Sequence, residues 1–489
     1  MKQELRWYDY ITINIYWLGF NVASGSITPV LLPYLVALFA PIELKNTYLA
    51  TLRVISLAVA MMIQPMAGML SDRSTHPAGR RRPYIVGGTL FSLLFLSIVG
   101  ASPDFMGSAL DGFFHPLLGI TTAYLVLLTG IVLLQASSNV ALGAVQGLIP
   151  DLVPEKQRGR ASGVKAVMEL TPAFLVIFVG PLVDAGRIWL TVGIIMGAFF
   201  ITMLITVLAV HEEPLSEKPA GGIREQILRL VALTVIFVAV TQAAVWMVRT
   251  SGAQLAHRGA VIGLQVAVVG LAGLIGMAGS ILVGVYLGAW VGIGKEARQQ
   301  TPFIWWVINR LLFLAGVGSI QGFAQYFLTD ALHIPNAATM TTVLMAVVAV
   351  FLIITALGSG YLADRIGRKR LVALSGVIAA GGTLLLLFST NIPMVIVSGC
   401  VIGIGAGTFM ATNWALGTDL VPPQEAGRYL GISNLAGAGA GIVGAGIGGP
   451  MADFFNALHP GLGYLVIFSA YGALFLLSVA TLTQVQEQG

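Results

Sequence analysis

Apolar residues along this chain gather in runs of about 20 residues or more, separated by short polar segments. The apolar positions do not alternate with a period of two, as the strands of a membrane barrel would require. Continuous runs of this length predict helices that cross a lipid bilayer. We expect fourteen such helices, over the ranges 11–38, 46–71, 84–102, 122–149, 162–184, 188–210, 227–248, 260–291, 303–328, 338–362, 371–390, 393–417, 429–452 and 462–482.

Composition supports the membrane assignment. Hydrophobic residues make up 57% of the 489 residues and charged residues only 10%, whereas an average soluble domain carries about 25% charged residues. So few charges could not cover the surface of a soluble protein of this size, and we expect an all-α membrane protein. The one cysteine, Cys400, lies in an apolar run, so neither a disulfide framework nor a thiolate metal site is expected.

Lysine and arginine are distributed unevenly between alternate loops. If the N-terminus is cytoplasmic, 19 of the 26 basic residues fall in cytoplasmic segments and 4 in outer segments, and Arg53, Lys165 and Arg310 lie inside spans. Basic residues collect in the cytoplasmic loops of membrane proteins. We therefore expect a multi-pass protein of a bacterial inner (plasma) membrane with both termini in the cytoplasm. Because the basic clusters fit this topology, no nucleic-acid partner is expected.

Two polar motifs occur twice, after the second and after the fourth helix of two six-helix sets. The first motif reads Gly-x-x-x-Asp-Arg followed by Gly-Arg-Arg/Lys, at 68–81 and at 360–369. The second reads Asp-Leu-Val-Pro followed by Gly-Arg, at 151–160 and at 419–428. Motifs recurring in the same order indicate parallel repeats, a known arrangement of transporter halves.

The repeat predicts three parts. Residues 1–210 would form an N-terminal six-helix bundle and residues 302–489 a C-terminal six-helix bundle. The segment 211–301 between them would be a central linker that carries two additional transmembrane helices.

The repeated Gly-x-x-x-Asp-Arg loop resembles the signature of the major facilitator superfamily between helices 2 and 3. Its first copy, which ends in Gly79-Arg-Arg-Arg-Pro83, is similar to the glycoside and sucrose symporter branch of that superfamily. In that branch the fourth helix usually carries an aspartate and an arginine, where this chain has Gln135 and Gln146. The resemblance implies the major facilitator fold and a secondary transporter that works by alternating access.

The resemblance also implies a role for the repeated loops, which would latch the two halves through charge-assisted bonds whose strength differs between states. An alternative is that these charges only anchor the loops to lipid and set the topology. The residues expected to form the gate or latch are Asp72, Arg73, Arg80, Arg81, Asp151, Arg160, Asp364, Arg365, Arg368, Asp419 and Arg428.

One carboxylate stands out as a coupling candidate. Of the 21 Asp and Glu residues, only Glu169 lies clearly inside a predicted span, and an intramembrane charge is costly enough to suggest a function. Lys165 lies one helical turn earlier, and Arg310 lies at a similar depth in the second half. Glu169 would carry the coupling proton or fix the solute through Arg310; alternatively, it would only neutralise Lys165.

Polar side chains near the middle of the predicted spans are the other candidates. Neutral amides and indoles suit a neutral hydroxylated solute better than an ion, although each of them could instead hold helices together. The candidate solute-binding residues are Asn21, Gln135, Ser138, Asn139, Trp306, Arg310, Gln321 and Gln325.

A glycine-rich stretch at 437–450 lies on the eleventh helix of the twelve in the repeat. Glycine lets helices approach closely, so a packing surface is one interpretation. The stretch also resembles a motif that antiporters carry on helix 5, where this chain has only Gly180-Pro181.

Together these features predict a proton-coupled secondary transporter of a small polar, neutral solute such as a sugar or glycoside. Two alternatives stay open: proton-driven efflux of amphiphilic compounds, and a non-transporting assembly or pigment-handling protein on the same fold. The sequence contains neither a Walker loop nor a His/Cys cluster, so we do not expect an enzyme. Neither a cofactor nor a metal is expected. The expected partners are the solute, protons and the lipid bilayer.

Overall fold

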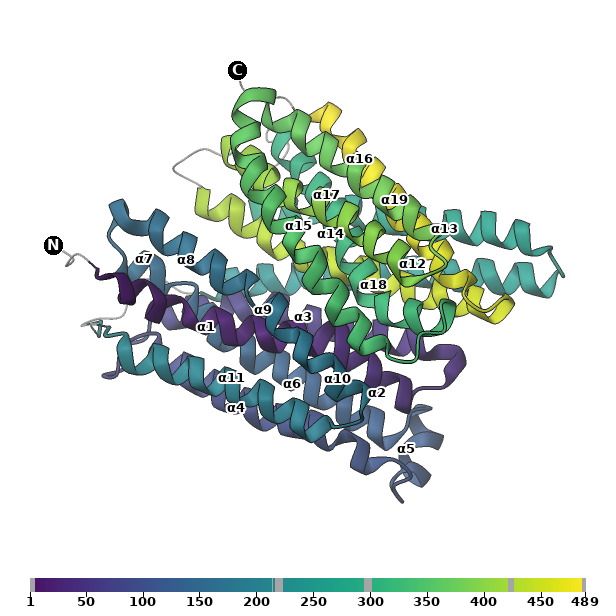
Figure 1. Cartoon of the computed structure of the whole chain (residues 1–489), viewed down its shortest axis with the longest axis horizontal. Helices are drawn as coiled ribbons and strands as arrows, with labels where there is room; N and C mark the ends of the chain where they lie inside the picture. The colour runs from purple at the N-terminus through teal and green to yellow at the C-terminus, as the bar shows by residue number, and fades with distance from the viewer. Residues whose placement is uncertain (1–4, 213, 216–222, 294–300, 421–425, 486–489) are drawn as a thin grey trace. The chain divides into compact units, whose positions relative to one another are not determined.

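The computed structural model describes residues 5–212, 214–215, 223–293, 301–420 and 426–485, and within these ranges the regular structure is helical (Figure 1). The longer helices are α1 (Trp7–Ser26), α3 (Lys45–Asp72), α4 (Arg82–Ala101), α6 (Thr122–Val145), α8 (Arg158–Leu170), α11 (Ile188–Ala209), α12 (Arg224–His257), α13 (Ile262–Ile293), α14 (Thr301–Tyr326), α15 (Ala337–Ile366), α16 (Arg368–Leu387), α17 (Ile392–Asp419), α18 (Ala426–Leu458) and α19 (Leu462–Thr481). The short ones are α2 (Leu32–Phe39), α5 (Asp111–Leu118), α7 (Leu148–Leu152), α9 (Pro172–Leu175) and α10 (Val179–Asp184).

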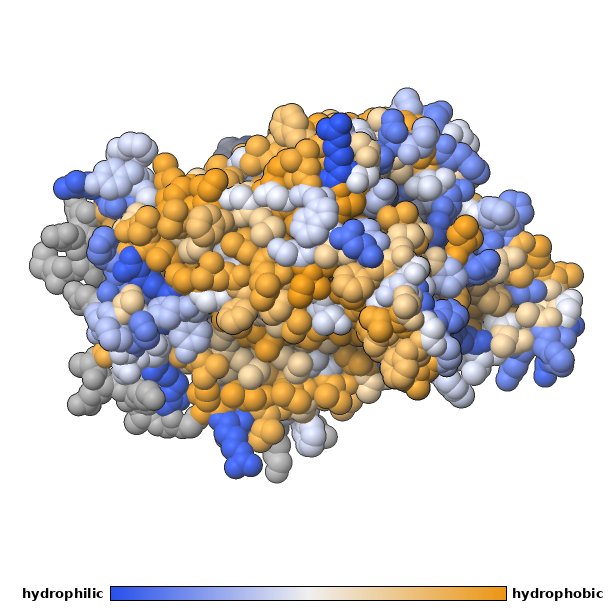
Figure 2. Space-filling view, turned by 90° about the horizontal axis from the view of Figure 1, so that it is seen from below, coloured by the Kyte–Doolittle hydropathy of each residue, from blue (hydrophilic) through white to orange (hydrophobic). Residues whose placement is uncertain are grey.

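The predicted all-α membrane fold is confirmed. In the described parts of the chain, 13 segments are long and apolar enough to cross a membrane, and the remaining predicted span, 429–452, falls on α18. Large apolar side chains such as Leu208, Leu357 and Phe388 are more than half exposed. Figure 2 shows apolar side chains over the middle of the visible face and hydrophilic ones toward its ends, as a bilayer requires.

Two predicted spans differ from the helices observed. The span 162–184 is broken into α8, α9, a 3-10 turn and α10, because Pro172 and Pro181 lack the N–H that a continuous helix needs. The span 227–248 was predicted too short, since α12 continues to His257. The added turns pack against α18, where a Cβ at Gly252 would lie 2.8 Å from the Phe454 ring.

The chain divides into two compact units. Unit 1 comprises Met1–Ala40 and Val59–Leu228, and unit 2 comprises Pro41–Ala58 and Arg229–Gly489. The helix α3 therefore contributes its first half to unit 2 and its second half to unit 1. The three-part division at 210 and 302 that the repeat suggests stays a prediction.

Small residues set the helix spacing in unit 1. The helix α4 packs on α6, and the Ser92 and Ser137 hydroxyls hydrogen-bond across this contact at 2.9 Å. A Cβ at Gly88 would lie only 2.7 Å from the Ser137 carbonyl oxygen. On α1, the buried Tyr16 hydroxyl bonds Thr89 of α4 at 2.9 Å. Close packing and interhelical hydroxyl bonds are the usual means of joining helices in a membrane.

The glycine-rich segment of α18 is a packing surface in unit 2. A Cβ at Gly439 would lie 2.7 Å from the Phe237 ring of α12, and one at Gly444 would lie 2.9 Å from a carbonyl oxygen of α14. These contacts agree with the packing interpretation of this stretch. They also place α12 and α13 against α18, so the additional pair of helices is part of unit 2.

The loop between α4 and α6 carries the short helix α5. Its Asp111 carboxylate accepts a hydrogen bond from the N–H of Thr122 at 2.6 Å. Hydrogen bonding to Thr122, through its side chain first and its backbone second, holds the pKa of Asp111 below its ordinary value. The backbone bond also ties the loop to the start of α6. Phe113 and Leu117 of α5 are 63% and 66% exposed, so this loop presents an apolar face.

Candidate functional site

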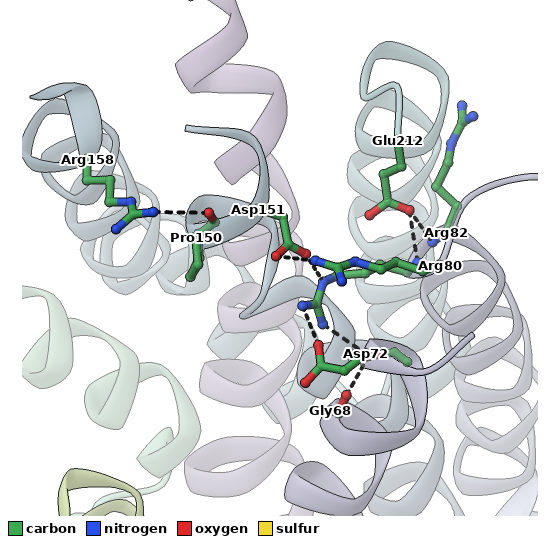
Figure 3. Close-up of polar contacts among 10 residues, drawn as sticks. Gly68, Asp72, Arg80, Arg82, Pro150, Asp151, Arg158 and Glu212 are labelled. Atoms are coloured by element: carbon green, nitrogen blue, oxygen red, sulfur yellow. Dashed lines mark hydrogen bonds and ion pairs between the residues drawn. The ribbon is translucent and has the colours of Figure 1, made fainter. Parts of the chain in front are cut away.

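A buried arginine organises the first copy of the repeated loop. Arg81 is 5% exposed, and its guanidinium donates through Nε to Asp151 at 2.5 Å, through Nη2 to Asp72 at 2.5 Å, and through Nη1 to Ser71 at 3.1 Å. Arg80 also pairs with Asp151. Figure 3 shows the Asp151 carboxylate pointing toward Arg80. The ends of α3 and α7 are thereby joined through one loop.

The fit of this arginine depends on nearby small and acidic residues. A side chain at Gly147 would overlap the Arg81 guanidinium. Glu212, which follows α11, accepts hydrogen bonds from the backbone N–H groups of Arg81 (2.9 Å) and Arg82 (3.2 Å), at the start of α4. Burial lowers the pKa of Arg81, but the bonds and charges of Asp151 and Asp72 outweigh it and raise the pKa above its ordinary value. Arg81 therefore stays charged.

The second copy of the loop shows a related arrangement. Arg368 donates to the carbonyl of Ala415 in α17 at 3.2 Å, and Lys369 donates to the carbonyl of Val485, beyond α19, at 2.6 Å. Arg365 lies over the Tyr361 ring, 4.7 Å from its centroid. In both copies, basic side chains of the loop reach the ends of the fourth and sixth helices of their own set.

The remaining expected gate residues are less informative. Arg73 is half-buried, and Arg160 is exposed in the first turn of α8. The side chains of Asp364, Asp419 and Arg428 lie outside the described residues. The contacts described for the first loop join helix ends within unit 1, so the latch between halves stays a prediction.

The coupling candidate Glu169 pairs with the lysine one turn before it. The Glu169 carboxylate lies 3.2 Å from Lys165 Nζ, and the two side chains are 35% and 31% exposed. The same Lys165 Nζ lies 4.1 Å from the centroid of the Trp17 ring. Asn21, one turn further along α1, donates to the Trp17 carbonyl at 2.8 Å. An ion pair of α8 and an indole of α1 thus meet in unit 1, and Asn21 bonds to the backbone of its own helix.

The candidates on α6 bond to their own helix. Asn139 donates to the Gln135 carbonyl at 2.8 Å and to its Oε1 at 3.1 Å, and the Ser138 hydroxyl lies 3.4 Å from the same carbonyl. Ser138 and Asn139 are buried, while Gln135 is half-buried. These bonds lie within α6 and use part of the hydrogen-bonding capacity of each side chain.

A second polar cluster lies in unit 2 between α14 and α17. Arg310 stands 5.0 Å from the centroid of the Trp414 ring, with Nη1 3.4 Å from Asn413 Oδ1. Its buried Nε has no hydrogen-bond acceptor among the described residues. Trp306 is fully buried, and its indole N–H donates to the Asn413 carbonyl at 2.9 Å. Arg310 is therefore the residue of this cluster with donor capacity left, whereas Trp306 has no exposed face.

The two glutamines of α14 differ from each other. Gln321 is exposed, and Gln325 is 5% exposed. Asn413, which contacts Arg310, Trp306 and Asn309, was not among the expected residues, although its place beside Trp414 in an apolar run is a usable signal. Glu212 was also missed, because its partners lie 130 residues away.

No group of three or more His, Cys, Asp or Glu side chains among the described residues is placed to hold a metal ion. Lysine, arginine and amide donors dominate the polar groups around Lys165 and around Arg310. Such donors bind oxygen-bearing solutes rather than metals.

The family profile of the Major Facilitator Superfamily matches residues 15–318 and 306–487. The chain therefore belongs to the Major Facilitator Superfamily, and it is a multi-pass membrane protein. This confirms the family that the doubled loop motif suggested.

Several curated transporters are similar over part of their length. They include the minor myo-inositol transporter IolF of Bacillus subtilis (32% identity over 88 residues, 18% of this chain and 20% of the relative). The glucose transporter GlcP of Staphylococcus epidermidis is 30% identical over 140 residues, 29% of this chain and 31% of the relative. The sucrose transport protein SUT1 of Oryza sativa is 33% identical over 109 residues, 21% of this chain and 20% of the relative. Each match spans less than a third of the relative.

Solved structures confirm the fold. A point mutant of the nucleoside transporter NupG superposes with a TM-score of 0.64 at 11% identity, over 98% of this chain and 100% of that one. A point mutant of a peptide transporter, POT, gives 0.64 at 12% identity, over 98% and 95%. These relatives and fold neighbours are transporters rather than enzymes, which agrees with the expectation from the sequence.

Proposed function

We propose that this protein is a symporter that moves a small, polar, neutral solute, such as a sugar or glycoside, together with a proton. The observation that carries the proposal is the Lys165–Glu169 pair, held at 3.2 Å against the Trp17 indole inside a membrane-spanning segment. Ionised side chains inside a membrane span are costly, so their presence there suggests a function in the transport pathway. The pair therefore supports a coupling role.

The relatives support the class of solute. By their names they carry myo-inositol, glucose, α-glucosides and sucrose, all of which are hydroxylated and uncharged. Amides such as Asn21, Gln135 and Asn139 donate and accept hydrogen bonds and so suit hydroxyl groups. Arg310, with one free donor beside Trp414, would bind a ring oxygen or hydroxyl while the indole covers an apolar face of the solute.

Glu169 is the residue we assign to the proton. A carboxylate that is neutral in one state and paired with Lys165 in another changes the charge of the site by one unit. Protonation would release Lys165 from the pair and let it bind elsewhere. Coupling arises when the solute binds one of these two states more tightly than the other.

The same proposal sets the orientation and the gates. With 19 basic residues on one side and 4 on the other, both termini lie in the cytoplasm of a bacterial inner membrane. The two loops around Asp72–Arg81 and Asp364–Lys369 then lie at the cytoplasmic face, and we assign to them the inner gate between the bundles 1–210 and 302–489.

Uptake into proteoliposomes tests the proposal. A panel of sugars, glycosides and inositols is offered with and without an inward proton gradient, to the unaltered protein and to Glu169→Gln. We expect gradient-driven accumulation of at least one solute by the unaltered protein, and only downhill exchange by the variant. The control is Glu155→Gln, because Glu155 also neighbours a basic residue (Arg158, 3.8 Å) but is 87% exposed.

Two results would count against the proposal. Accumulation by Glu169→Gln at the level of Glu155→Gln would remove Glu169 from the coupling step. Transport confined to lipophilic cations would replace the sugar-like solute with the efflux alternative.

A further inference from the structure

Asp453 of α18 caps the start of α3 within unit 2. It is 6% exposed, and its Oδ1 accepts hydrogen bonds from the N–H of Asn46 at 3.1 Å and from the Asn46 amide at 2.8 Å. Its Oδ2 accepts a third from the N–H of Thr47 at 2.7 Å. The first N–H groups of a helix have no helical partner, and the helix dipole favours a negative charge there. Asp453 supplies both the acceptors and the charge from 407 positions away.

A second carboxylate acts beside the first. Asp330, in the π-helical turn after α14, lies 2.6 Å from Lys45 Nζ and accepts a hydrogen bond from the Tyr464 hydroxyl. That hydroxyl is also 3.3 Å from Asn46 Oδ1. The first residues of α3 are therefore held by α14, α18 and α19 together.

The next turns of α3 rest on glycines of α18. A Cβ at Gly441 would lie 2.7 Å from Leu57, and one at Gly446 would lie 2.9 Å from Val54. The glycine face is smooth, so few side chains interlock across this contact. Such a surface permits close approach and also permits separation without the unpacking of large side chains.

Arg53, in the same stretch of α3, contacts α14, and its guanidinium is only partly satisfied. It is 8% exposed, and its Nη2 donates to the Gly318 carbonyl of α14 at 3.2 Å. Its buried Nη1 has no acceptor among the described residues, and none of their carboxylates forms an ion pair with it. A permanent contact normally satisfies its buried polar groups. The unmet donor is a cost to the docked arrangement and so makes its release easier.

The capping carboxylate belongs to a third repeated motif. Gly449-Pro450-Met-Ala-Asp453 on α18 matches Gly180-Pro181-Leu-Val-Asp184 on α10, 269 residues earlier. This spacing agrees with the 268 residues that separate the two Asp-Leu-Val-Pro motifs. Asp184 lies at the end of the fifth helix of the first set, and Asp453 lies near the end of the eleventh helix of the twelve.

We propose that the Gly-Pro-x-x-Asp motif is a releasable helix cap: Asp453 docks the first half of α3 onto α18 in one state of the transport cycle and releases it in another, and Asp184 is its counterpart in the first repeat. This inference rests on the chain's being a transporter and not on the identity of its solute. Asp453 and Asp330 are positioning residues, since they bind a moving helix and not the solute.

Cysteine accessibility tests the release directly and needs no solute. In a Cys400→Ser background, Val54→Cys places a thiol of similar volume at a position that is 5% exposed. Its alkylation by a membrane-impermeant maleimide reports how often α3 leaves α18. Asp453→Asn removes the charge of the cap, and we expect alkylation about ten times faster or more, from the weight of charge-assisted hydrogen bonds. Asp184→Asn is expected to change the rate in the same direction.

Controls and a second variant keep the test decisive. Asp104→Asn removes an exposed carboxylate and should leave the rate unchanged. If Asp453→Asn does not fold, Asp330→Asn weakens the same contact. If Asp104→Asn and the folded cap variant, Asp453→Asn or Asp330→Asn, are alkylated at the same rate, the proposal is overturned. If Asp453→Asn changes the rate and Asp184→Asn does not, the role assigned to Asp184 is overturned.

A cross-link tests whether release is needed for transport. Asn46→Cys with Asp453→Cys in the cysteine-free background would be joined by oxidation, and solute exchange would be measured before and after reduction. We expect exchange to stop in the joined protein and to return with a reductant. Full exchange in the joined protein overturns the proposal. If the unjoined protein moves no sugar-like solute, the proposed solute class fails, while the alkylation result still decides the release.

Discussion

At the scale of single residues, Arg81 shows how a charged group can be buried when its donors are bonded. Its guanidinium is buried, yet three side chains accept its hydrogen bonds, so the cost of burial is offset. A loop held in this way transmits a displacement of α3 to the end of α7, because both carboxylates bind one rigid planar group.

The space for this group depends on Gly147, which gives a first prediction. Gly147→Ala would drive a methyl group into the guanidinium, and we expect a loss of stability of about 1–3 kcal/mol from overpacking. Thermal unfolding in detergent measures it. The matched control is Gly159→Ala, also near the helical ends of this region, where a Cβ would meet nothing within 4 Å. Equal melting temperatures for the two variants would contradict this account of Arg81.

At the scale of helices, the glycine face of α18 lets several helices of unit 2 pack closely against it. At Gly444 a Cβ would lie 2.9 Å from the Ala315 carbonyl oxygen, whereas at Gly437 the nearest atom would be 3.9 Å away. We predict that Gly444→Ala destabilises the protein by about 1–3 kcal/mol and that Gly437→Ala leaves its stability nearly unchanged. Chemical unfolding followed by tryptophan fluorescence compares them. An equal loss in both variants would contradict the contact at Gly444, because alanine has the higher helix propensity and does not destabilise a helix by itself.

The additional pair of helices is anchored by one aromatic residue. Phe237 of α12 is 1% exposed and packs against Gly284 of α13 and Gly439 of α18. Phe237→Ala would leave a cavity at this junction, and we expect a loss of about 3–5 kcal/mol at most, the range for buried phenylalanines. Trp246→Ala on the same helix removes a side chain that is 69% exposed and serves as the control. Limited proteolysis in detergent should be faster only in Phe237→Ala.

Sequence patterns predicted the helices better than their contacts. The apolar length of a span is a local property, so thirteen of fourteen predicted ranges fall on described membrane spans. The end of α12 was missed because its last turns pack against α18, where Gly252 lies beside Phe454, 202 positions away. The repeated motifs marked Asp72, Arg81 and Asp151 as gate residues, but their direct contacts within unit 1 were not predicted. The hydrogen bonds of Glu212 and Asp453 join residues 130 and 407 positions apart, and no local sequence pattern predicts them.

At the scale of the whole molecule, binding of the correct solute should stabilise the folded protein. A solute at about 100 times its dissociation constant adds about 2.7 kcal/mol to the free energy of unfolding. We predict that a sugar, glycoside or inositol raises the melting temperature of the purified protein, and that Arg310→Gln reduces the shift. Lipophilic cations, nucleosides and amino acids are the comparison set. Stabilisation by that set alone would contradict the proposed solute class.

The short helix α5 has a consequence for work with the isolated protein. Its exposed Phe113 and Leu117 suit the headgroup layer of a bilayer, where aromatic and aliphatic side chains anchor a surface helix. Because the Asp111–Thr122 hydrogen bond ties α5 to the start of α6, forces in that layer act on a membrane-spanning helix. The thickness and headgroups of the surrounding lipid are therefore variables of this protein's stability, and nanodiscs of different lipids are separate conditions rather than interchangeable supports.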